Sequence, residues 1–340
     1  MPIRVAVAGA GSMGLNHIRV LRDFGDDIAQ LVAVAEPDES ARTRVADRFG
    51  VKCYADFREM IAETKPDLAT VVVPTHLHFD VASHILDAGV SVLVEKPIAA
   101  TAEQARKLID LADVRGVRLA VGHVERFNPA VVELKRLLDT GGLGNIFSLL
   151  ARRLGPFPPR IRDVGVILDL ATHDLDVMRY LTGSDIVHVS AETQRRVHEM
   201  HEDMVLALVR FHSGAVGVLD VNWLTPTKVR ELSVTGERGM YLVNYLTQDL
   251  YFFENSSAAN MTSWDSTPTP IGVSEGAMTR LVVRKAEPLK LEYEDIFRAM
   301  RTDTDVTVTG RDGLAVLEVA QRLLEAANTD QLTSTPEAGR

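Results

Sequence analysis

The chain has 340 residues, 46% of them hydrophobic, and this length predicts two globular domains rather than one. Its formal net charge of −10 disfavours nucleic acid and anionic lipid as partners, because both are themselves negative. The single cysteine, Cys53, excludes an internal disulfide and a cysteine-rich zinc site and indicates a reducing compartment.

The N-terminal run 3–14 is apolar, but it is short and breaks into glycines, which favours a buried strand over a signal peptide. No other stretch approaches the ~20 apolar residues that a membrane span needs. We therefore expect a soluble, cytoplasmic protein with neither a membrane partner nor a nucleic-acid partner.

The first third of the chain alternates short β-branched runs with longer amphipathic runs, as parallel strands joined by crossover helices do. Strands are expected at Ile3–Ala8, Leu31–Glu36, Lys52–Tyr54, Leu68–Val73, Ser91–Val94 and Arg118–Val121. Helices are expected at Leu15–Phe24, Glu39–Phe49, Phe57–Glu63, Phe79–Ala88 and Ala102–Arg115. Four of these helices run into a glycine, where a helix C-terminus favours the left-handed conformation: Gly25, Gly50, Gly89 and Gly116. The pattern predicts a doubly wound α/β domain with a parallel sheet over residues 1–122.

After Gly122 the pattern changes. Helices are expected at Pro129–Asp139, Asp169–Leu181, Leu291–Met300 and Asp312–Ala327, a turn at Gly155–Pro159 and a loop at Asn255–Gly272. Residues 186–283 indicate mostly strands, among them Met204–Phe211, Val216–Val221 and Glu231–Val234. Their alternating polarity predicts a large, mostly antiparallel open sheet with one solvated face. We expect a second α/β domain over 123–330, with helix 312–327 able to pack back on the first domain, and a polar tail at 331–340.

The segment Gly9-Ala10-Gly11-Ser12-Met13-Gly14 follows one expected strand and opens a helix, the context in which this glycine spacing indicates a dinucleotide site. Gly9 permits the tight turn, Gly11 lets the backbone approach a pyrophosphate, and Gly14 lets the helix pack closely on the strand. The helix N-terminus, at Ser12 and Met13, attracts the negative charge. An ordinary strand-to-helix turn is the alternative.

Glu36 ends the second strand, 22 positions after Gly14, where the dinucleotide motif expects an acidic residue at about 20. A carboxylate there accepts hydrogen bonds from the adenosine ribose hydroxyls and repels a 2′-phosphate, which predicts NAD rather than NADP. A solvated strand-end glutamate is the alternative. Arg42 or Arg44 would soften the preference if either side chain reached back to Glu36.

Glu95-Lys96-Pro97 follows the strand Ser91–Val94, and ligands of open α/β sheets bind outside the carboxyl ends of the strands. A lysine there is placed to face a nicotinamide. Pro97 keeps the backbone of the preceding residue out of the helical region and lowers the cost of a cis peptide bond. A rigid backbone therefore orients Lys96. A plain surface loop is the alternative.

Four segments in order along nearly the whole chain resemble the glucose-fructose oxidoreductase / inositol dehydrogenase (Gfo/Idh/MocA) family. They are Gly9 to Gly14, Pro74-Thr75-x-x-His78, Glu95-Lys96-Pro97 and Asp169-x-x-x-His173-Asp174. The resemblance implies a Rossmann domain that binds NAD, followed by an α/β domain whose open sheet forms dimers or tetramers.

The resemblance also implies roles for individual residues. Lys96 would bind the reacting hydroxyl, His173 would be the acid/base, and Asp169 would hold the substrate or orient the site. Glu95 and Thr75 would contact the nicotinamide ribose, with His78 close by.

Chemistry supports the same roles, because oxidising an alcohol requires a base for the hydroxyl proton and an acceptor for the hydride. Histidine titrates near neutral pH. A spacing of four places Asp169 and His173 on one helix face, and Asp176 is close enough to assist. A helix histidine merely paired with an acid is the alternative. No metal is expected, because neither His76 with His78 nor His198 with His201 has a third ligand at a familiar spacing.

Two segments, 122–129 and 155–165, resemble the branch of the family that oxidises carbon 3 of UDP-N-acetylglucosamine with NAD. They carry Arg126, Arg160 and Arg162 in an acidic chain, and guanidinium groups bind diphosphates in a bidentate manner. Ordinary ion pairing with Asp163 or Glu125 is the alternative for each arginine.

The first hypothesis is therefore oxidation of a sugar hydroxyl to a ketone, at C3 of a UDP-sugar, by a homodimer or homotetramer. An inositol 2-dehydrogenase, or another sugar or cyclitol dehydrogenase of the same family, is the alternative. A non-catalytic NAD-binding regulator is a third reading, but such a protein would tolerate loss of Lys96 or His173, and this chain keeps both.

Overall fold

The structure is a computed structural model that describes residues 1–158, 164–255 and 276–333, with side chains described up to residue 327. By contacts it divides into two units, Met1–Phe127 with Glu287–Glu318, and Asn128–Ala286 with the chain from Val319. No helix in the described ranges is long and apolar enough to cross a membrane.

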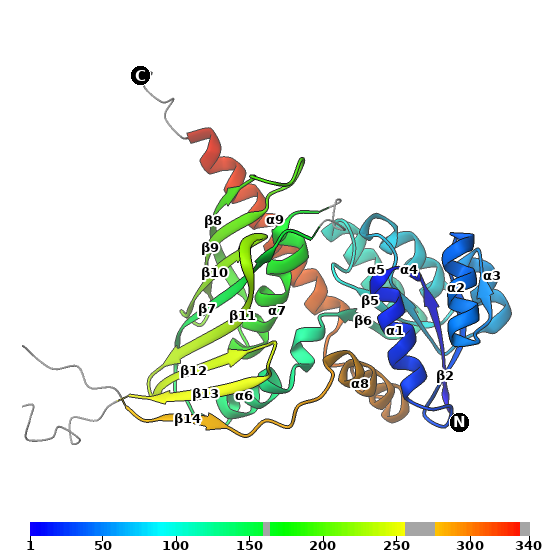
Figure 1. Ribbon diagram of the computed structural model, residues 1–340, viewed down its shortest axis with the longest axis horizontal. Coiled ribbons are helices and arrows are strands. Elements are labelled where there is room, and N and C mark those ends of the chain that lie inside the picture. Colours follow the sequence, from blue (N-terminus) through cyan, green and yellow to red (C-terminus); the bar gives the residue numbers. More distant parts are fainter. Residues whose placement is uncertain (159–163, 256–275, 334–340) are drawn as a thin grey trace, which may run out of the picture. The chain divides into compact units, whose positions relative to one another are not determined.

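A six-stranded parallel sheet forms the first unit, in the order β3-β2-β1-β4-β5-β6. Its strands are β1 Ile3–Ala8, β2 Ala29–Ala35, β3 Cys53–Tyr54, β4 Leu68–Val71, β5 Ser91–Glu95 and β6 Leu119–Gly122. The helices between them are α1 Ser12–Asp23, α2 Glu39–Phe49, α3 Phe57–Thr64, α4 His78–Asp87 and α5 Ala102–Arg115 (Figure 1). This order is that of a doubly wound dinucleotide-binding sheet, so the predicted fold of the first domain is confirmed.

The predicted helix ends are also confirmed. Gly25, Gly50, Gly89 and Gly116 all have left-handed backbones, with φ between +60° and +78°. At such angles a side chain is strained, and glycine is not.

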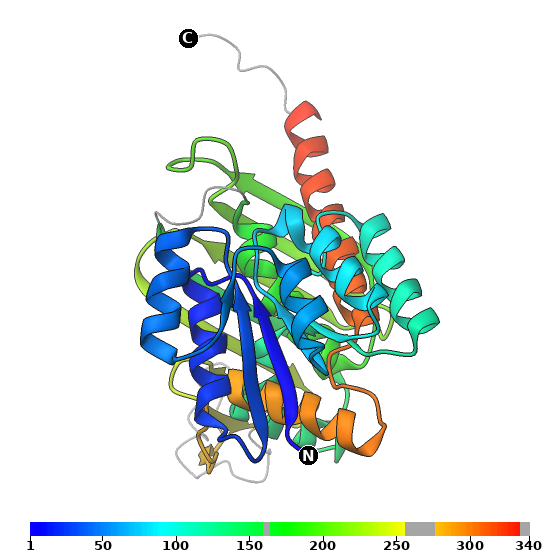
Figure 2. The ribbon, with the colours of Figure 1, turned by 90° about the vertical axis from the view of Figure 1, so that its right-hand side faces the viewer.

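The first unit is discontinuous in sequence, which corrects the expected domain boundaries. Helix α8, Pro288–Thr302, packs Leu289, Tyr293 and Phe297 into the same core as α1, β1 and β2. Figure 2 shows α8, in orange, beside the blue strands β1 and β2. The first turns of α9, Gly310–Thr333, also belong to this unit. Sequence periodicity shows that these helices have apolar faces, but it does not show which core those faces cover.

The second unit contains an eight-stranded sheet in the order β14-β13-β12-β11-β7-β10-β9-β8. Its strands are β7 Ile146–Pro156, β8 Ile186–Gln194, β9 Met204–Phe211, β10 Val216–Asn222, β11 Leu224–Gly236, β12 Gly239–Asn244, β13 Asp249–Glu254 and β14 Met278–Leu281. Only β7 and β10 pair in parallel, so the mostly antiparallel sheet is confirmed.

The central strand β7 has no counterpart among the predicted elements, and its last residues, Gly155 and Pro156, were assigned to a turn. Helices α6, Pro129–Asp139, and α7, Thr172–Thr182, cover one face of this sheet (Figure 1). Along β9, Leu206 and Leu208 point to the opposite face and are 45% and 51% exposed. The expected loop lies outside the described residues apart from Asn255.

Candidate active site

The glycine loop between β1 and α1 has the close packing and the open space that a pyrophosphate needs. A Cβ added at Gly9, where φ is +104°, would overlap the carbonyl oxygen of Val72, and one at Gly14 would overlap the carbonyl of Gly9. A Cβ at Gly11 would instead meet no protein atom within 4 Å. Gly11 precedes α1, and no side chain caps this helix. The first turn, at Ser12 and Met13, therefore presents its N–H groups at an open surface, which fits the predicted NAD site.

The Glu36 carboxylate lies directly beside this loop. Its Oε2 accepts a hydrogen bond from the Ala10 N–H at 2.8 Å, and its Oε1 accepts one from the Asp38 N–H at 3.1 Å. Arg42 donates to the carbonyl oxygens of Glu36 and Pro37, and Arg44 donates to the Ser40 hydroxyl. In these hydrogen bonds both arginines bind groups other than the Glu36 carboxylate, and the contact of Glu36 with the adenosine ribose stays a prediction.

At the end of β5, the Glu95 side chain turns into the interior. Its Oε1 lies 2.9 Å from Nε2 of His17 on α1, and its Oε2 accepts the Lys96 N–H at 3.1 Å. Nδ1 of His17 lies 2.8 Å from the Tyr293 hydroxyl of α8, which lies 2.9 Å from the Thr70 hydroxyl of β4. Four elements of the first unit therefore fix the carboxylate that precedes Lys96.

Burial and pairing act in opposite directions on Glu95. Burial by itself would raise the pKa of this carboxyl, but the hydrogen bond and charge of His17, with the charge of Lys96, hold the pKa below its usual value. Burial also raises the pKa of Tyr293 well above its usual value, so its hydroxyl stays protonated. Gly122 at the end of β6 completes the enclosure, because a Cβ there would lie 3.0 Å from the Glu95 carboxylate.

His78 at the start of α4 connects the ends of β4 and β5. Its Nδ1 lies 2.7 Å from the Pro97 carbonyl oxygen, its Nε2 lies 2.9 Å from that of Val73, and the side chain is 1% exposed. Burial lowers the pKa of His78, and the hydrogen bonds to these two carbonyls partly oppose that effect. The Lys96–Pro97 bond is cis, as the sequence allows.

These partners give Glu95 and His78 a structural task. Both side chains are buried and bind groups of the protein itself, whereas the expected contact of Glu95 with the nicotinamide ribose, and the place of His78 close to it, stay predictions. The structure thus gives them the task of fixing the backbone on either side of Lys96. Thr75 begins a short 3-10 turn, Thr75–Leu77, and Thr75 and Lys96 are both half-buried. Direct contact of these two with the cofactor stays a prediction.

Asp169 and His173 belong to the second unit. His173 lies in the first turn of α7, whereas Asp169 lies in a π-helical turn, Ile167–Ala171, that precedes α7. The predicted helix from Asp169 was therefore wrong in type at its start, and such π turns often occur at functional sites. Both side chains are half-buried, whereas Asp176 is fully buried.

A buried ion pair fixes α7 on the sheet. Arg153 of β7 donates to both carboxylate oxygens of Asp174, at 2.7 and 3.0 Å, and the two side chains are 4% and 1% exposed. A bidentate pair defines direction as well as distance. Asp174 is the neighbour of His173, so this pair also fixes the backbone that carries the predicted acid/base.

The arginines proposed for the diphosphate are not supported as a cluster. Arg126 is 5% exposed, and its guanidinium binds Asp312 at 2.9 Å and the Thr307 carbonyl oxygen at 3.2 Å. Arg126 joins the segment before α6 to the start of α9, and its guanidinium is therefore not available as a substrate ligand. Arg160 and Arg162 lie outside the described residues.

No group of three or more His, Cys, Asp or Glu side chains that could hold a metal ion occurs within the described ranges. His198 and His201 do lie together, with ring centroids 5.1 Å apart. Nδ1 of His198, however, accepts hydrogen bonds from two backbone N–H groups, those of Met200 and His201.

His17 and Tyr293 were missed by sequence reasoning. For His17 a signal existed, because it lies three residues after Gly14 on a helix face that is otherwise apolar, with Ile18 and Leu21. A histidine on such a face needs a buried partner. Tyr293 offered no comparable signal, since it is separated from His17 by 276 residues.

The substitution His17→Leu tests this network. It leaves the Glu95 carboxylate buried without its main partner, so the free energy of unfolding should fall by about 3–5 kcal/mol at neutral pH. In the wild type, the lowered pKa of Glu95 contributes stability that is lost as the pH falls through that pKa. In the variant, burial is no longer offset and the pKa of Glu95 rises, so the stability deficit should shrink as the pH falls from the raised pKa of the variant to the lowered pKa of the wild type.

Urea unfolding at neutral and acidic pH measures this deficit. His84→Leu, which removes an exposed histidine from α4, is the control and should change stability by less than about 0.5 kcal/mol. A deficit in His17→Leu that stays constant with pH would contradict the ionised state of Glu95.

Comparison with known proteins identifies the family of the chain. Residues 3–123 match an oxidoreductase family with an NAD-binding Rossmann fold, and residues 131–242 match the GFO/IDH/MocA C-terminal domain. The chain is 30% identical to the UDP-N-acetylglucosamine 3-dehydrogenase of Acidithiobacillus ferrooxidans, over 94% of this chain and 95% of that protein.

A solved structure of a UDP-N-acetylglucosamine 3-dehydrogenase from that organism aligns with a TM-score of 0.84 at 28% identity, over 97% of this chain and 98% of the other. Inositol 2-dehydrogenase 2 of Saccharopolyspora erythraea is 34% identical over 58% of each chain. The chain is therefore an NAD-dependent dehydrogenase and belongs to the Gfo/Idh/MocA oxidoreductase family.

Proposed function

We propose that this dehydrogenase oxidises a sugar hydroxyl to a ketone, and that the hydroxyl is the one at C3 of UDP-N-acetylglucosamine. One observation carries the substrate: a UDP-N-acetylglucosamine 3-dehydrogenase matches almost the whole chain, including the second unit. Arg160 and Arg162, which the sequence predicts as diphosphate ligands, favour a nucleotide-sugar substrate. Arg126 does not, because its guanidinium is bound to Asp312 within the protein. The chain's single cysteine favours the cytoplasm as its compartment.

The residues divide the chemistry between them. Bound NAD supplies the hydride acceptor, and the protein must supply the base and the polar contacts to the reacting oxygen. Lys96 donates a hydrogen bond to that oxygen and stabilises the charge that develops on it, while His173 takes the hydroxyl proton. Asp169 holds the substrate or orients the site. Charge on the oxygen is stabilised best by groups that are already in position, and Glu95, His17 and Asp174 supply such support to the backbone.

An inositol 2-dehydrogenase is the second candidate, because Inositol 2-dehydrogenase 2 of Saccharopolyspora erythraea has the higher identity, 34%, over the shorter match. A substrate panel separates the two. We expect UDP-N-acetylglucosamine, but not myo-inositol or free N-acetylglucosamine, to raise the unfolding temperature in the presence of NAD and to produce NADH absorbance. Turnover of inositol without turnover of the UDP-sugar would reverse this ranking.

The substitutions Lys96→Met and His173→Asn test the assigned roles. Each should lower kcat by about 10²- to 10⁴-fold, the usual contribution of a positioned acid/base or charge-stabilising group, with little change in the Kd for NAD. Steady-state kinetics and NAD titration measure these effects. Lys107→Met, on the exposed face of α5, and His84→Asn are matched controls and should behave as the wild type. Near-normal turnover in both active-site variants would contradict the mechanism.

Glu36 should determine the choice of cofactor. We expect NAD to bind more tightly than NADP, because the Glu36 carboxylate accepts hydrogen bonds from the ribose hydroxyls and repels a 2′-phosphate. Glu36→Ala should lower the affinity for NAD roughly tenfold to hundredfold, the range for a hydrogen bond to a charged group. It should lower the affinity for NADP less. Calorimetric titration with both nucleotides measures this. Equal affinities in the wild type would contradict the assignment.

We also propose that the protein assembles as a homodimer or homotetramer through the exposed face of the eight-stranded sheet. Leu150, Leu206 and Leu208 lie on this face and are 40–51% exposed. Val218 of β10 pairs with both Leu150 and Leu208, so the apolar side chains form one continuous surface.

Leu208→Glu should convert the assembly to monomers, as light scattering after gel filtration would show. Leu246→Glu is the matched control, because Leu246 is equally exposed, at 51%, but lies in the turn between β12 and β13. A monomeric wild type would exclude this assembly.

A further inference from the structure

The segment that leads into Asp169 begins without a cap of its own. Val166 precedes the π-helical turn, and its apolar side chain makes no capping hydrogen bond to the first N–H groups of that turn. Such groups need an acceptor when they are buried, and Val166 and Ile167 are fully buried. The acceptor must therefore come from elsewhere in the chain.

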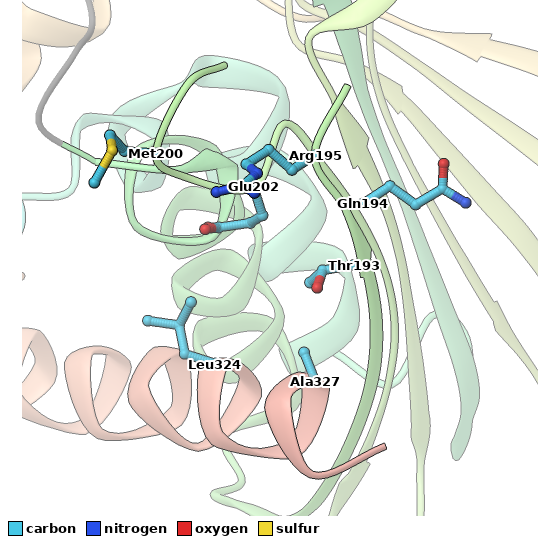
Figure 3. Close-up of a pocket in the computed structure, with 7 residues that line it drawn as sticks. All are labelled: Thr193, Gln194, Arg195, Met200, Glu202, Leu324 and Ala327. Atoms are coloured by element: carbon cyan, nitrogen blue, oxygen red, sulfur yellow. The ribbon is translucent and has the colours of Figure 1, made fainter. Parts of the chain in front are cut away.

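Glu202, 35 residues further along the chain, supplies it twice. Its carboxylate Oε1 accepts the Ile167 N–H at 3.1 Å, and its backbone carbonyl accepts the Val166 N–H at 3.0 Å. A Cβ added at Gly165 would overlap all three carboxylate atoms of Glu202, so the absence of a side chain at Gly165 makes the contact possible. Figure 3 shows the Glu202 carboxylate at the wall of a hollow that Arg195, Met200 and Leu324 also line.

The loop that carries Glu202 is itself held in place. Oδ2 of the fully buried Asp203 accepts three backbone N–H groups, those of Arg196, Val197 and His198, at 2.5–3.0 Å. Nδ1 of His198 accepts two more, at 3.0 Å. Side chains therefore accept hydrogen bonds from five backbone N–H groups within residues 196–201. These bonds hold the backbone that leads to Glu202.

We propose that Glu202 is a positioning residue for the dehydrogenase site, because it caps the turn that carries Asp169 and, on the following turn, His173. The inference rests on the function proposed above for these two residues. A carboxylate at a helix N-terminus is favourable by charge as well as by hydrogen bonding. Misplacing a catalytic group by about 1 Å can cost 10²-fold in rate, so a cap that sets this turn affects catalysis without touching the substrate.

Two substitutions at Glu202 separate its contributions. Glu202→Ala removes the acceptor and should lower kcat by about 10- to 100-fold, with little change in the Kd for NAD. Glu202→Gln keeps an oxygen that can accept the Ile167 N–H, and it should recover most of that loss. Glu199→Ala, an exposed carboxylate on the same loop, is the control and should match the wild type.

Gly165→Ala tests the same contact from the other side. The added methyl group should push the Glu202 carboxylate into the neighbouring hollow, while the backbone at Gly165 tolerates alanine, since its φ is not left-handed. We expect the same loss of kcat as in Glu202→Ala. The double variant, Gly165→Ala with Glu202→Ala, should be no worse than Glu202→Ala alone, because the three atoms nearest to the added methyl group, all from the Glu202 carboxylate, are then gone.

Hydrogen exchange gives a readout that does not need the substrate. The amide of Ile167, which loses its acceptor, should exchange faster in Glu202→Ala and Gly165→Ala, and near the wild-type rate in Glu202→Gln. The amide of Val166 is bonded to the backbone carbonyl of residue 202, which all three variants keep, and it serves as the internal reference. If the wild type oxidises none of the sugars tested, the proposed function fails. Hydrogen exchange then still shows whether Glu202 caps the turn. Unchanged exchange in Glu202→Ala would overturn the proposal. Changed exchange with normal kcat would show a purely structural cap and would overturn it as well.

Discussion

Glu95 carries a negative charge into the interior of the first unit, and His17 supplies the matching hydrogen bond at 2.9 Å. A buried carboxylate is tolerated only where its lost contacts with water are replaced, and a cation or hydrogen-bond donors are needed for that. Here α1 provides the histidine, while α8 and β4 orient it through Tyr293 and Thr70. The same helix α1 begins at the glycine loop, so the shape of this loop and the position of Lys96 depend on one set of contacts.

The second unit uses the same kind of support. Arg153 holds α7 through Asp174, and Glu202 holds the turn before it, so the Asp169–His173 segment is fixed at two points. In both units, the side chains with predicted roles in the reaction, Lys96, Asp169 and His173, are half-buried, whereas those that hold the backbone are more deeply buried or come from distant segments. This division follows from chemistry, because a reacting group must be accessible and must also be kept from moving.

Sequence reasoning succeeded where the determining signal is local. The alternation of strands and helices, the glycines at helix ends and the place of Glu36 all depend on neighbours within one βαβ unit. Sequence reasoning failed where the structural role of a residue depends on a partner far away in the sequence. Strand β7 was missed because Arg152 and Arg153 interrupt its apolar pattern, and the burial of Arg153 depends on its ion pair with Asp174. Arg126 looked like a phosphate ligand, but its partner Asp312 is 186 residues away.

The membership of α8 in the first unit affects how the protein is made. Tyr293 is added to the growing chain 166 residues after Phe127, the last residue of the N-terminal segment. At typical synthesis rates this delay lasts roughly ten to thirty seconds. During that time His17 has no Tyr293 hydroxyl to bind, and the apolar surface that α8 covers stays exposed. The first unit therefore cannot complete its core until the last third of the chain has been made, and its apolar surface is exposed for longer than that of a contiguous domain.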